Sequence, residues 1–326
     1  MSDKRLRVGV IGLGSMGASH ARVYDEIERV ELAAVADTSR ERLQQAGVAT
    51  YADYRRMLAE ERLDAVSVCV PTLLHREVAL AAIEADIAVL VEKPIAATVA
   101  DGEAMALAAE QAGLPLMVGH VERFNPAVLA VRQLLEAGEL GRVYQVSARR
   151  VGPFPERVRD VGVVQDLAPH DIDVMRFLLE SEVERAYAET LQGVATEHED
   201  MLWGILRFEN GAVGMLEVNW LTPVKVRELS VLGEKGLLRA DYLSQEVVVY
   251  TKGEGVETRD AAPTIVAVQK AEPLRLELEA FVDAVRRGVA PPVSAADGLV
   301  ALQIASMLVE SALTGRVVEA PARRPA

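Results

Sequence analysis

Two short clusters of ionisable residues have the types needed to move a proton. Glu92-Lys93-Pro94 directly follows an apolar run, and lysine is the rarest charged residue in the chain. Further on, Asp166 and His170 stand four residues apart, a spacing that puts both on one face of a helix. An aspartate can orient an imidazole and keep it basic, so His170 could take a proton from a hydroxyl. The alternatives are a surface lysine and a helix start whose acids suit the dipole.

A glycine-rich turn near the N-terminus predicts the cofactor. Residues 8–17 read Val-Gly-Val-Ile-Gly-Leu-Gly-Ser-Met-Gly, and Asp37 closes the next apolar run. In such a G-x-G-x-x-G loop the first glycine permits the turn, the second admits the pyrophosphate and the third lets the helix pack on the sheet. Asp37 would accept hydrogen bonds from the ribose, which favours NAD over NADP, whereas Arg40 could offer a partner to a 2′-phosphate. The alternative is a glycine-rich turn in an unrelated α/β protein.

The remaining cofactor residues are expected where strands end. Pro71 fixes a turn after an apolar run, and His75 falls on the first turn of the next helix, where it could line the cofactor or only pack. The predicted cofactor-binding set is Gly12, Gly14, Ser15, Met16, Gly17, Asp37, Pro71, Thr72, His75, Glu92 and Lys93.

The elements that position these residues form an α/β pattern. Apolar runs at 6–11, 31–36, 65–70, 87–91 and 116–119 alternate with helical patterns at 18–27, 40–46, 54–60, 75–85 and 99–112. This alternation predicts a doubly wound parallel sheet, with ligands bound beyond the carboxyl ends of the strands. We expect an NAD(P)-binding Rossmann domain over residues 1–121.

After residue 121 the pattern changes to a second α/β domain, expected over 122–326. Asn125-Pro126 starts a helix that Gly138 ends, and strand-like runs follow at 142–151, 185–191, 201–208, 212–221, 226–232, 236–241 and 246–250. Their turn signals predict antiparallel hairpins. Helices are expected over 169–179, 272–287 and 295–314, the last between caps at Ser294 and Gly315.

Composition excludes several classes of protein. The net charge of −14 argues against nucleic acid as a partner. We find no apolar run of membrane-spanning length, no cleavable signal and one cysteine, Cys69, so we expect a soluble, cytoplasmic protein with no membrane partner. No H-E-x-x-H or C-x-x-C spacing occurs, so we expect no metal site.

These motifs together resemble the glucose–fructose oxidoreductase/inositol dehydrogenase (Gfo/Idh/MocA) family over almost the whole chain. The resemblance lies in the glycine loop with His20, the Pro71…His75 turn, Glu92-Lys93-Pro94, the Asp166…His170 pair and the C-terminal stretch from Glu272. It implies a second domain with an open, mostly antiparallel sheet, and NAD(P)-dependent oxidation or reduction of a sugar-like alcohol. It also implies catalytic roles for Lys93, Asp166 and His170. Many members have glycines where this chain has Val163-Val164-Gln165.

Residues 118–127 and 166–173 look most like members that oxidise nucleotide-activated amino sugars. The resemblance implies UDP-N-acetylglucosamine as substrate, oxidised at its 3-hydroxyl, and an aminotransferase downstream. Arginines near residue 153 could meet its phosphates or form a solvated loop. The predicted substrate-binding residues are His120, Arg123, Asn125, Arg149, Arg157, Gln165, Asp166 and His170, and Arg150 and Arg159 belong to the same arginine group.

Two other functions stay open at this point. One is a dehydrogenase of free sugars or inositols, and the other is a non-catalytic dinucleotide-binding sensor, which would not need Lys93 or His170. We also expect a homo-oligomer, a dimer or tetramer, because strands 213–218 and 226–232 carry apolar residues toward both faces of their sheet.

Overall fold

The computed structural model describes residues 5–154, 162–195, 197–252 and 263–321, which fold into two compact units. The first unit comprises the chain up to Val121 together with Glu272–Leu302. The second comprises Glu122–Ala271 and the chain from Gln303 onward. Residues 272–302, which the sequence alone assigns to the second domain, therefore belong to the first unit.

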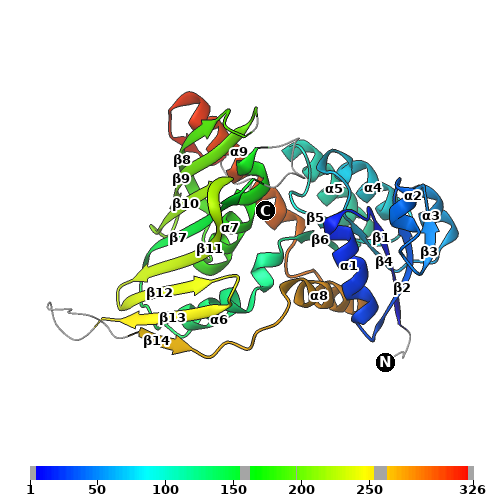
Figure 1. Cartoon of the computed structure of the whole chain (residues 1–326), viewed down its shortest axis with the longest axis horizontal. Coiled ribbons are helices and arrows are strands. Elements are labelled where there is room, and N and C mark those ends of the chain that lie inside the picture. The colour runs from blue at the N-terminus through cyan, green and yellow to red at the C-terminus, as the bar shows by residue number, and fades with distance from the viewer. Residues whose placement is uncertain (1–4, 155–161, 196, 253–262, 322–326) are drawn as a thin grey trace. The chain divides into compact units, whose positions relative to one another are not determined.

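The first unit is built on a six-stranded sheet in the order β3-β2-β1-β4-β5-β6 (Figure 1). Every neighbouring pair is parallel, and the order reverses direction between β1 and β4. This confirms the doubly wound sheet. The strands are β1 Leu6–Ile11, β2 Val30–Ala36, β3 Ala49–Tyr51, β4 Ala65–Val68, β5 Ala88–Glu92 and β6 Leu116–Gly119.

Local sequence signals set the helices of this unit. Thr98 caps α5 by accepting a hydrogen bond from the Asp101 amide at 3.1 Å, and Gly113 ends it with a φ of 67°. The helices are α1 Ser15–Glu26, α2 Arg40–Leu43, α3 Tyr54–Glu60, α4 His75–Glu84, α5 Val99–Ala112, α8 Pro273–Arg287 and the first part of α9 Ala295–Thr314. The short 3₁₀ helix η1 spans Thr72–Leu74.

The second unit is built on a nine-stranded sheet in the order β14-β13-β12-β11-β7-β10-β9-β8-β15. Its pairs are antiparallel except for β10 with β7, which the sequence did not predict. The mostly antiparallel sheet is thus confirmed. The strands are β7 Val143–Pro153, β8 Val183–Gln192, β9 Glu199–Phe208, β10 Val213–Asn219, β11 Leu221–Gly233, β12 Gly236–Asp241, β13 Glu246–Thr251, β14 Pro263–Val266 and β15 Val318–Glu319.

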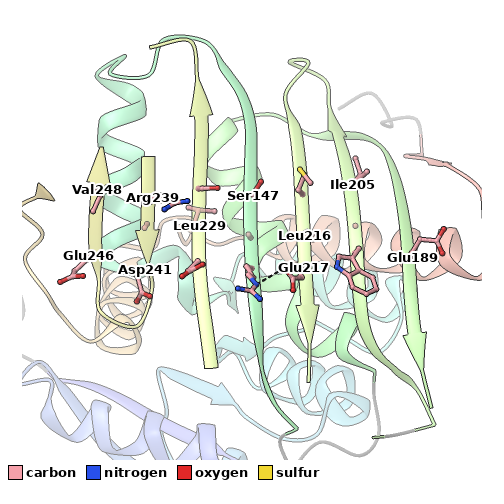
Figure 2. Close-up of a pocket in the computed structure, with 18 of the residues that line it drawn as sticks. Ser147, Glu189, Ile205, Leu216, Glu217, Leu229, Arg239, Asp241, Glu246 and Val248 are labelled. Carbon is pink, nitrogen blue, oxygen red and sulfur yellow. Dashed lines mark hydrogen bonds and ion pairs between the residues drawn. The ribbon is translucent and has the colours of Figure 1, made fainter. Parts of the chain in front are cut away.

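Helices cover one face of this second sheet. They are α6 Pro126–Glu136, α7 Val163–Leu179 and the end of α9, whose Ser311 hydroxyl accepts a hydrogen bond from the Ala188 amide at 3.0 Å. Strand alternation buries Leu216 and Val218 toward the helices and leaves Met215 exposed on the other face. That other face holds an open hollow of about 650 Å³ (Figure 2).

One helix in the described part of the chain, α9, is long and apolar enough to cross a membrane by length and composition. This corrects the expectation that no such run exists. The property alone is weak evidence of a membrane span, because core helices of soluble proteins share it.

Candidate functional site

The glycine loop in the first unit has the geometry that its spacing predicts. Gly12 has a φ of +89°, and a Cβ there would lie 2.6 Å from the Cys69 carbonyl oxygen. A Cβ on Gly17 would lie 1.7 Å from the Gly12 carbonyl oxygen. Neither position tolerates a side chain, so α1 starts close against β1 and β4.

Gly14 differs because the space beside it is open. A Cβ at this position would meet no atom within 4 Å. Gly14 is also the N-cap of α1 and makes no side-chain cap, so the first amides of the helix, from Ser15 and Met16, have no capping side chain. An open approach to an uncapped helix N-terminus fits a pyrophosphate group. The residues present therefore fit a bound dinucleotide.

Asp37 stands at the carboxyl end of β2 with its carboxylate already oriented. The Leu13 amide donates to Oδ2 at 2.6 Å, and the Ser39 amide donates to Oδ1 at 2.7 Å. These bonds leave further lone pairs for ribose hydroxyls. Arg42 reaches Asp37, with Nη1 at 3.4 Å from Oδ2, and the role of Arg40 as a partner for a 2′-phosphate stays a prediction.

Lys93 follows β5 at the carboxyl edge of the sheet, and its peptide bond to Pro94 is cis. Its amide donates to Oε2 of Glu92 at 3.2 Å. The other oxygen of Glu92 lies 3.0 Å from His20 Nε2, and His20 Nδ1 lies 3.1 Å from the Ser67 hydroxyl. Burial acts to raise the pKa of Glu92, but the hydrogen bond from His20 and nearby positive charge outweigh burial and lower it. A buried ionised carboxylate thus anchors the backbone of Lys93.

The described residues contain one group that could share a metal ion, formed by His20, Cys69 and Glu92. Two of its members are already bonded to each other. Burial, followed by the charge of Glu92, raises the pKa of the Cys69 thiol well above its usual value, which disfavours the thiolate that a metal requires. The absence of a metal site stays a prediction.

His75 links two loops at this edge. Its Nδ1 lies 2.9 Å from the Pro94 carbonyl oxygen, and its Nε2 lies 3.0 Å from the Val70 carbonyl oxygen. Burial lowers the pKa of His75. A neutral imidazole has one N–H, so it donates to one of these carbonyl oxygens, and the ring packs between the turn at Pro71 and the loop that carries Lys93.

In the second unit, Asp166 and His170 lie on the same helix. Helix α7 begins at Val163, six residues before the predicted start at 169, and contains Pro169. Both side chains therefore belong to successive turns of one helix, four residues apart. Asp166 is buried and His170 is half-buried, while Gln165 is half-buried in the first turn.

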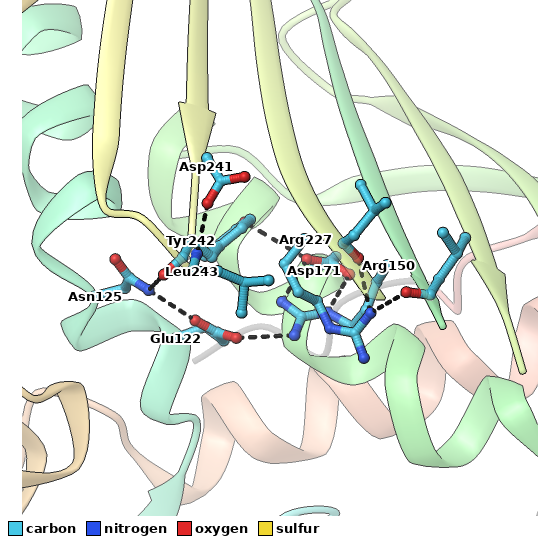
Figure 3. Close-up of polar contacts among 10 residues, drawn as sticks. Glu122, Asn125, Arg150, Asp171, Arg227, Asp241, Tyr242 and Leu243 are labelled. Carbon is cyan, nitrogen blue, oxygen red and sulfur yellow. Dashed lines mark hydrogen bonds and ion pairs between the residues drawn. The ribbon is translucent and has the colours of Figure 1, made fainter. Parts of the chain in front are cut away.

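Asp166 lies in the first turn of α7, so the helix-dipole alternative stays open for it, whereas Asp171 lies further along the helix and bonds to an arginine. Asp171 accepts two hydrogen bonds from Arg150, from Nε at 2.7 Å and from Nη2 at 3.0 Å (Figure 3). Arg150 also donates through Nη1 to Glu122 at 2.8 Å. The opposite charges of Asp171 and Glu122 raise the pKa of Arg150 against its burial. The pair fastens α7 to β7, so the arginine is engaged within the protein.

Two residues predicted to meet the substrate are likewise engaged. Arg123 forms a buried ion pair with Asp173, with Nε at 2.9 Å from Oδ2. Asn125 caps α6, as predicted, by accepting from the Ala127 amide at 3.1 Å, and it donates to the Tyr242 carbonyl oxygen at 3.1 Å. Both residues hold the second unit together.

The other predicted substrate residues are scattered. Arg149 pairs with Glu217 at 3.0 Å on the face of the second sheet that no helix of the described structure covers, which we call the bare face. Arg150 lies on the opposite face. His120 is buried in the first unit at the end of β6. Arg157 and Arg159 lie outside the described residues. Arg149 is therefore left out of the substrate-binding residues that we propose below.

One residue beside this cluster was missed. Arg227 on β11 is aligned with Arg150 on β7. The strand buries Leu229 and Val231 toward the helices, so Arg227 occupies a position of the buried face by alternation. A charged residue in line with buried apolar ones was the signal in the sequence.

Comparison with known proteins decides the family. Residues 6–120 match the model of an oxidoreductase family with an NAD-binding Rossmann fold, and residues 132–320 match its C-terminal alpha/beta domain. The chain belongs to the Gfo/Idh/MocA family. It is therefore an oxidoreductase, as predicted, and the comparisons give no support to a non-catalytic sensor.

Several curated relatives share the same sequence identity with this protein. D-apiose dehydrogenase of Paraburkholderia graminis is 30% identical over 97% of this chain and 90% of its own. Myo-inositol 2-dehydrogenase of Thermotoga maritima is 30% identical over 91% and 93%. UDP-N-acetylglucosamine 3-dehydrogenase of Acidithiobacillus ferrooxidans is 30% identical over 86% and 88%. Its solved structure superposes with a TM-score of 0.85 at 27% identity, covering 94% and 97%. Such relatives support action on a sugar or polyol hydroxyl.

Proposed function

We propose that this oxidoreductase uses NAD to oxidise a secondary ring hydroxyl of a UDP-amino sugar, first of all the 3-hydroxyl of UDP-N-acetylglucosamine. The observation that carries the chemistry is the pair of Asp166 and His170 on consecutive turns of α7. A carboxylate beside an imidazole is the arrangement of a general base and the group that orients it.

The preference for NAD rests on Asp37. Its carboxylate is fixed by the Leu13 and Ser39 amides, and it would accept hydrogen bonds from the ribose hydroxyls. A 2′-phosphate would meet Asp37 as a like charge. Arg42 is the nearby cation that could reduce this repulsion. NADP is therefore expected to bind more weakly.

Each proposed catalytic residue has one role. NAD, when bound, supplies the hydride acceptor. His170 takes the hydroxyl proton while Asp166 holds the imidazole, and Lys93 donates a hydrogen bond to the reacting oxygen. The buried Glu92 carboxylate holds the Lys93 backbone, so the lysine leaves the strand in a fixed direction. Lys93 belongs to the first unit and His170 to the second. The role of each residue is inferred from its surroundings in its own unit.

The choice of a nucleotide sugar rests on the 3-dehydrogenase relative and on the likeness of residues 118–127 and 166–173 to members that oxidise such sugars. The second candidate is a free sugar or an inositol, because the apiose and inositol dehydrogenases are equally similar. An aminotransferase that consumes a 3-keto product would be a natural partner.

The test follows NADH formation with UDP-N-acetylglucosamine, free N-acetylglucosamine, apiose and myo-inositol. An aminotransferase and glutamate are added to remove a keto product. We expect turnover with the nucleotide sugar. Turnover of a free sugar or inositol alone would replace the proposed substrate and leave the family unchanged.

We also propose that the bare face of the second sheet binds a second copy of the chain. Trp203 is 49% exposed there, Ile205 48% and Met215 44%. Arg149, Arg239, Glu217 and Glu246 on the same face supply both signs of charge (Figure 2). A two-fold axis could bring such a face against itself, with opposite charges paired.

A further inference from the structure

Arg227 is a partly buried cation whose side-chain hydrogen bonds, among the described residues, go to backbone oxygens. Its Nη1 donates to the Val151 carbonyl oxygen at 2.6 Å and to the Val226 carbonyl oxygen at 2.7 Å. Among the described residues no carboxylate forms an ion pair with it. Figure 3 shows its guanidinium beside that of Arg150. Since a guanidinium carries five N–H donors, two bonds through one nitrogen leave Nε and Nη2 without a bond to any described residue.

Two of the nearby carboxylates, those of Asp171 and Glu122, are bonded to Arg150. Burial, followed by the charge of Arg150, lowers the pKa of Arg227 to about 10, and Asp171, Glu122 and Asp166 oppose this only at a distance. The guanidiniums of Arg150 and Arg227 are thus adjacent, but Asp171 and Glu122 form their bonds with Arg150. Such a desolvated cation gains most from an added anion.

The same end of the sheet carries other buried donors. Trp220, 3% exposed, has an indole N–H with no hydrogen-bond acceptor in the described structure. It directly follows Asn219, which pairs with Val151, and Val151 also pairs with Val226 of β11. Trp220 directly follows β10 and Arg227 lies on β11, so the two donors come from segments on either side of the end of β7. A buried donor without an acceptor is rare and costly, so the indole N–H would gain from an acceptor on a bound ligand or an ordered water.

We propose that Arg227, with the Trp220 indole N–H, forms an anion-binding subsite for a phosphate or carboxylate group of the substrate. It lies on the side of the sheet that carries α7, and Asp166 is close enough to act on Arg227 electrostatically. The identification of its anion as part of the oxidised substrate rests on the proposed function. If the substrate is a UDP-sugar, the anion is its diphosphate; if it is a uronate, the anion is its carboxylate.

The test measures binding by calorimetry to the full-length, NADH-loaded enzyme, because NADH blocks the phosphate site of the glycine loop. The probes are UDP-N-acetylglucosamine, inorganic pyrophosphate and glucuronate. The variant is Arg227→Gln. The matched control is Arg207→Gln on β9, whose Nη1 also donates to a carbonyl oxygen, that of Gly211, at the opposite end of the sheet.

We expect Arg227→Gln to weaken binding about 10- to 100-fold, the usual worth of a charge-assisted hydrogen bond, and Arg207→Gln to change nothing. Weaker binding of UDP-N-acetylglucosamine and pyrophosphate assigns the subsite to phosphate, and weaker binding of glucuronate alone assigns it to carboxylate. Arg227→Lys, which keeps the charge, should lose less, and it replaces the glutamine variant if that variant does not fold.

Two results would overturn the subsite: unchanged binding of every probe in the folded variant, or no binding of any probe to the wild type. Failure of the subsite can be distinguished from failure of the proposed function. Turnover of UDP-N-acetylglucosamine with an unchanged KM in Arg227→Gln would retain the substrate and remove the subsite. Arg227-dependent glucuronate binding without turnover of the nucleotide sugar would do the reverse.

Discussion

Arg150 and Asp171 form a bidentate ion pair in which both side chains are almost fully buried, with bonds of 2.7 and 3.0 Å. Removing one partner strands a buried charge, so Arg150→Ala or Asp171→Ala should lower the free energy of unfolding by about 3–5 kcal/mol. Urea denaturation measures this. A double variant, Arg150→Met with Asp171→Leu, should recover much of the loss; single variants as stable as the wild type would show that the pair is not buried in solution.

Lys93 and His170 should be needed for turnover but not for folding. General acid–base catalysis contributes about 100- to 10,000-fold, so Lys93→Ala and His170→Ala should lose rate in that range. Their melting temperatures should stay near that of the wild type. Arg207→Gln serves as the control for a neutral substitution. Nearly full activity in His170→Ala would reassign the base, with Lys93 the first alternative.

Asp37 and Arg42 should set the balance between NAD and NADP. Calorimetry on the wild type should show tighter binding of NAD. Asp37→Ala removes the like charge and should raise NADP affinity relative to NAD by about tenfold, equivalent to about 1.4 kcal/mol. Arg42→Ala should weaken NADP and spare NAD. Tighter NADP binding by the wild type would mean that Arg42 outweighs Asp37.

His75 should make stability depend on pH. Burial lowers its pKa below the 6.5 of an ordinary histidine, so the unfolded chain takes up a proton before the native protein does. Its contribution is complete above pH 6.5 and is lost as the pH falls toward the lowered native pKa. The stability difference between wild type and His75→Asn should therefore shrink from pH 7.5 to 5.5 in urea titrations. A difference that grows at low pH contradicts this assignment.

The bare sheet face should hold the oligomer together. Trp203→Asp with Met215→Asp places charges on the exposed apolar surface and should produce monomers in light scattering at micromolar concentration. Arg56→Gln, an exposed substitution on α3 of the first unit, should leave the assembly unchanged. A wild-type mass of only 35.3 kDa would remove the proposal.

Local sequence determined the elements and the cofactor loop. The caps at Thr98 and Ser294 and the glycines at 12 and 17 act on neighbours in the chain or on the adjoining strand. The alternation of apolar runs likewise gave the parallel sheet. The caps and the apolar runs depend on hydrogen bonds and periodicity over a few residues, and the glycine loop has a recognisable spacing, so all of them can be identified without the tertiary structure.

Tertiary structure decided which charged residues remain available to a ligand. Arg149 and Arg150 are neighbours in sequence, but strand alternation sends them to opposite faces, and the partner of Arg150 lies 21 residues away on α7. Arg227 acquires its place beside Arg150 only through the register of β11 with β7. Ion pairing and burial depend on long-range register and packing, because an arginine that meets a carboxylate is structural, whereas one that meets only carbonyl oxygens can still bind an anion.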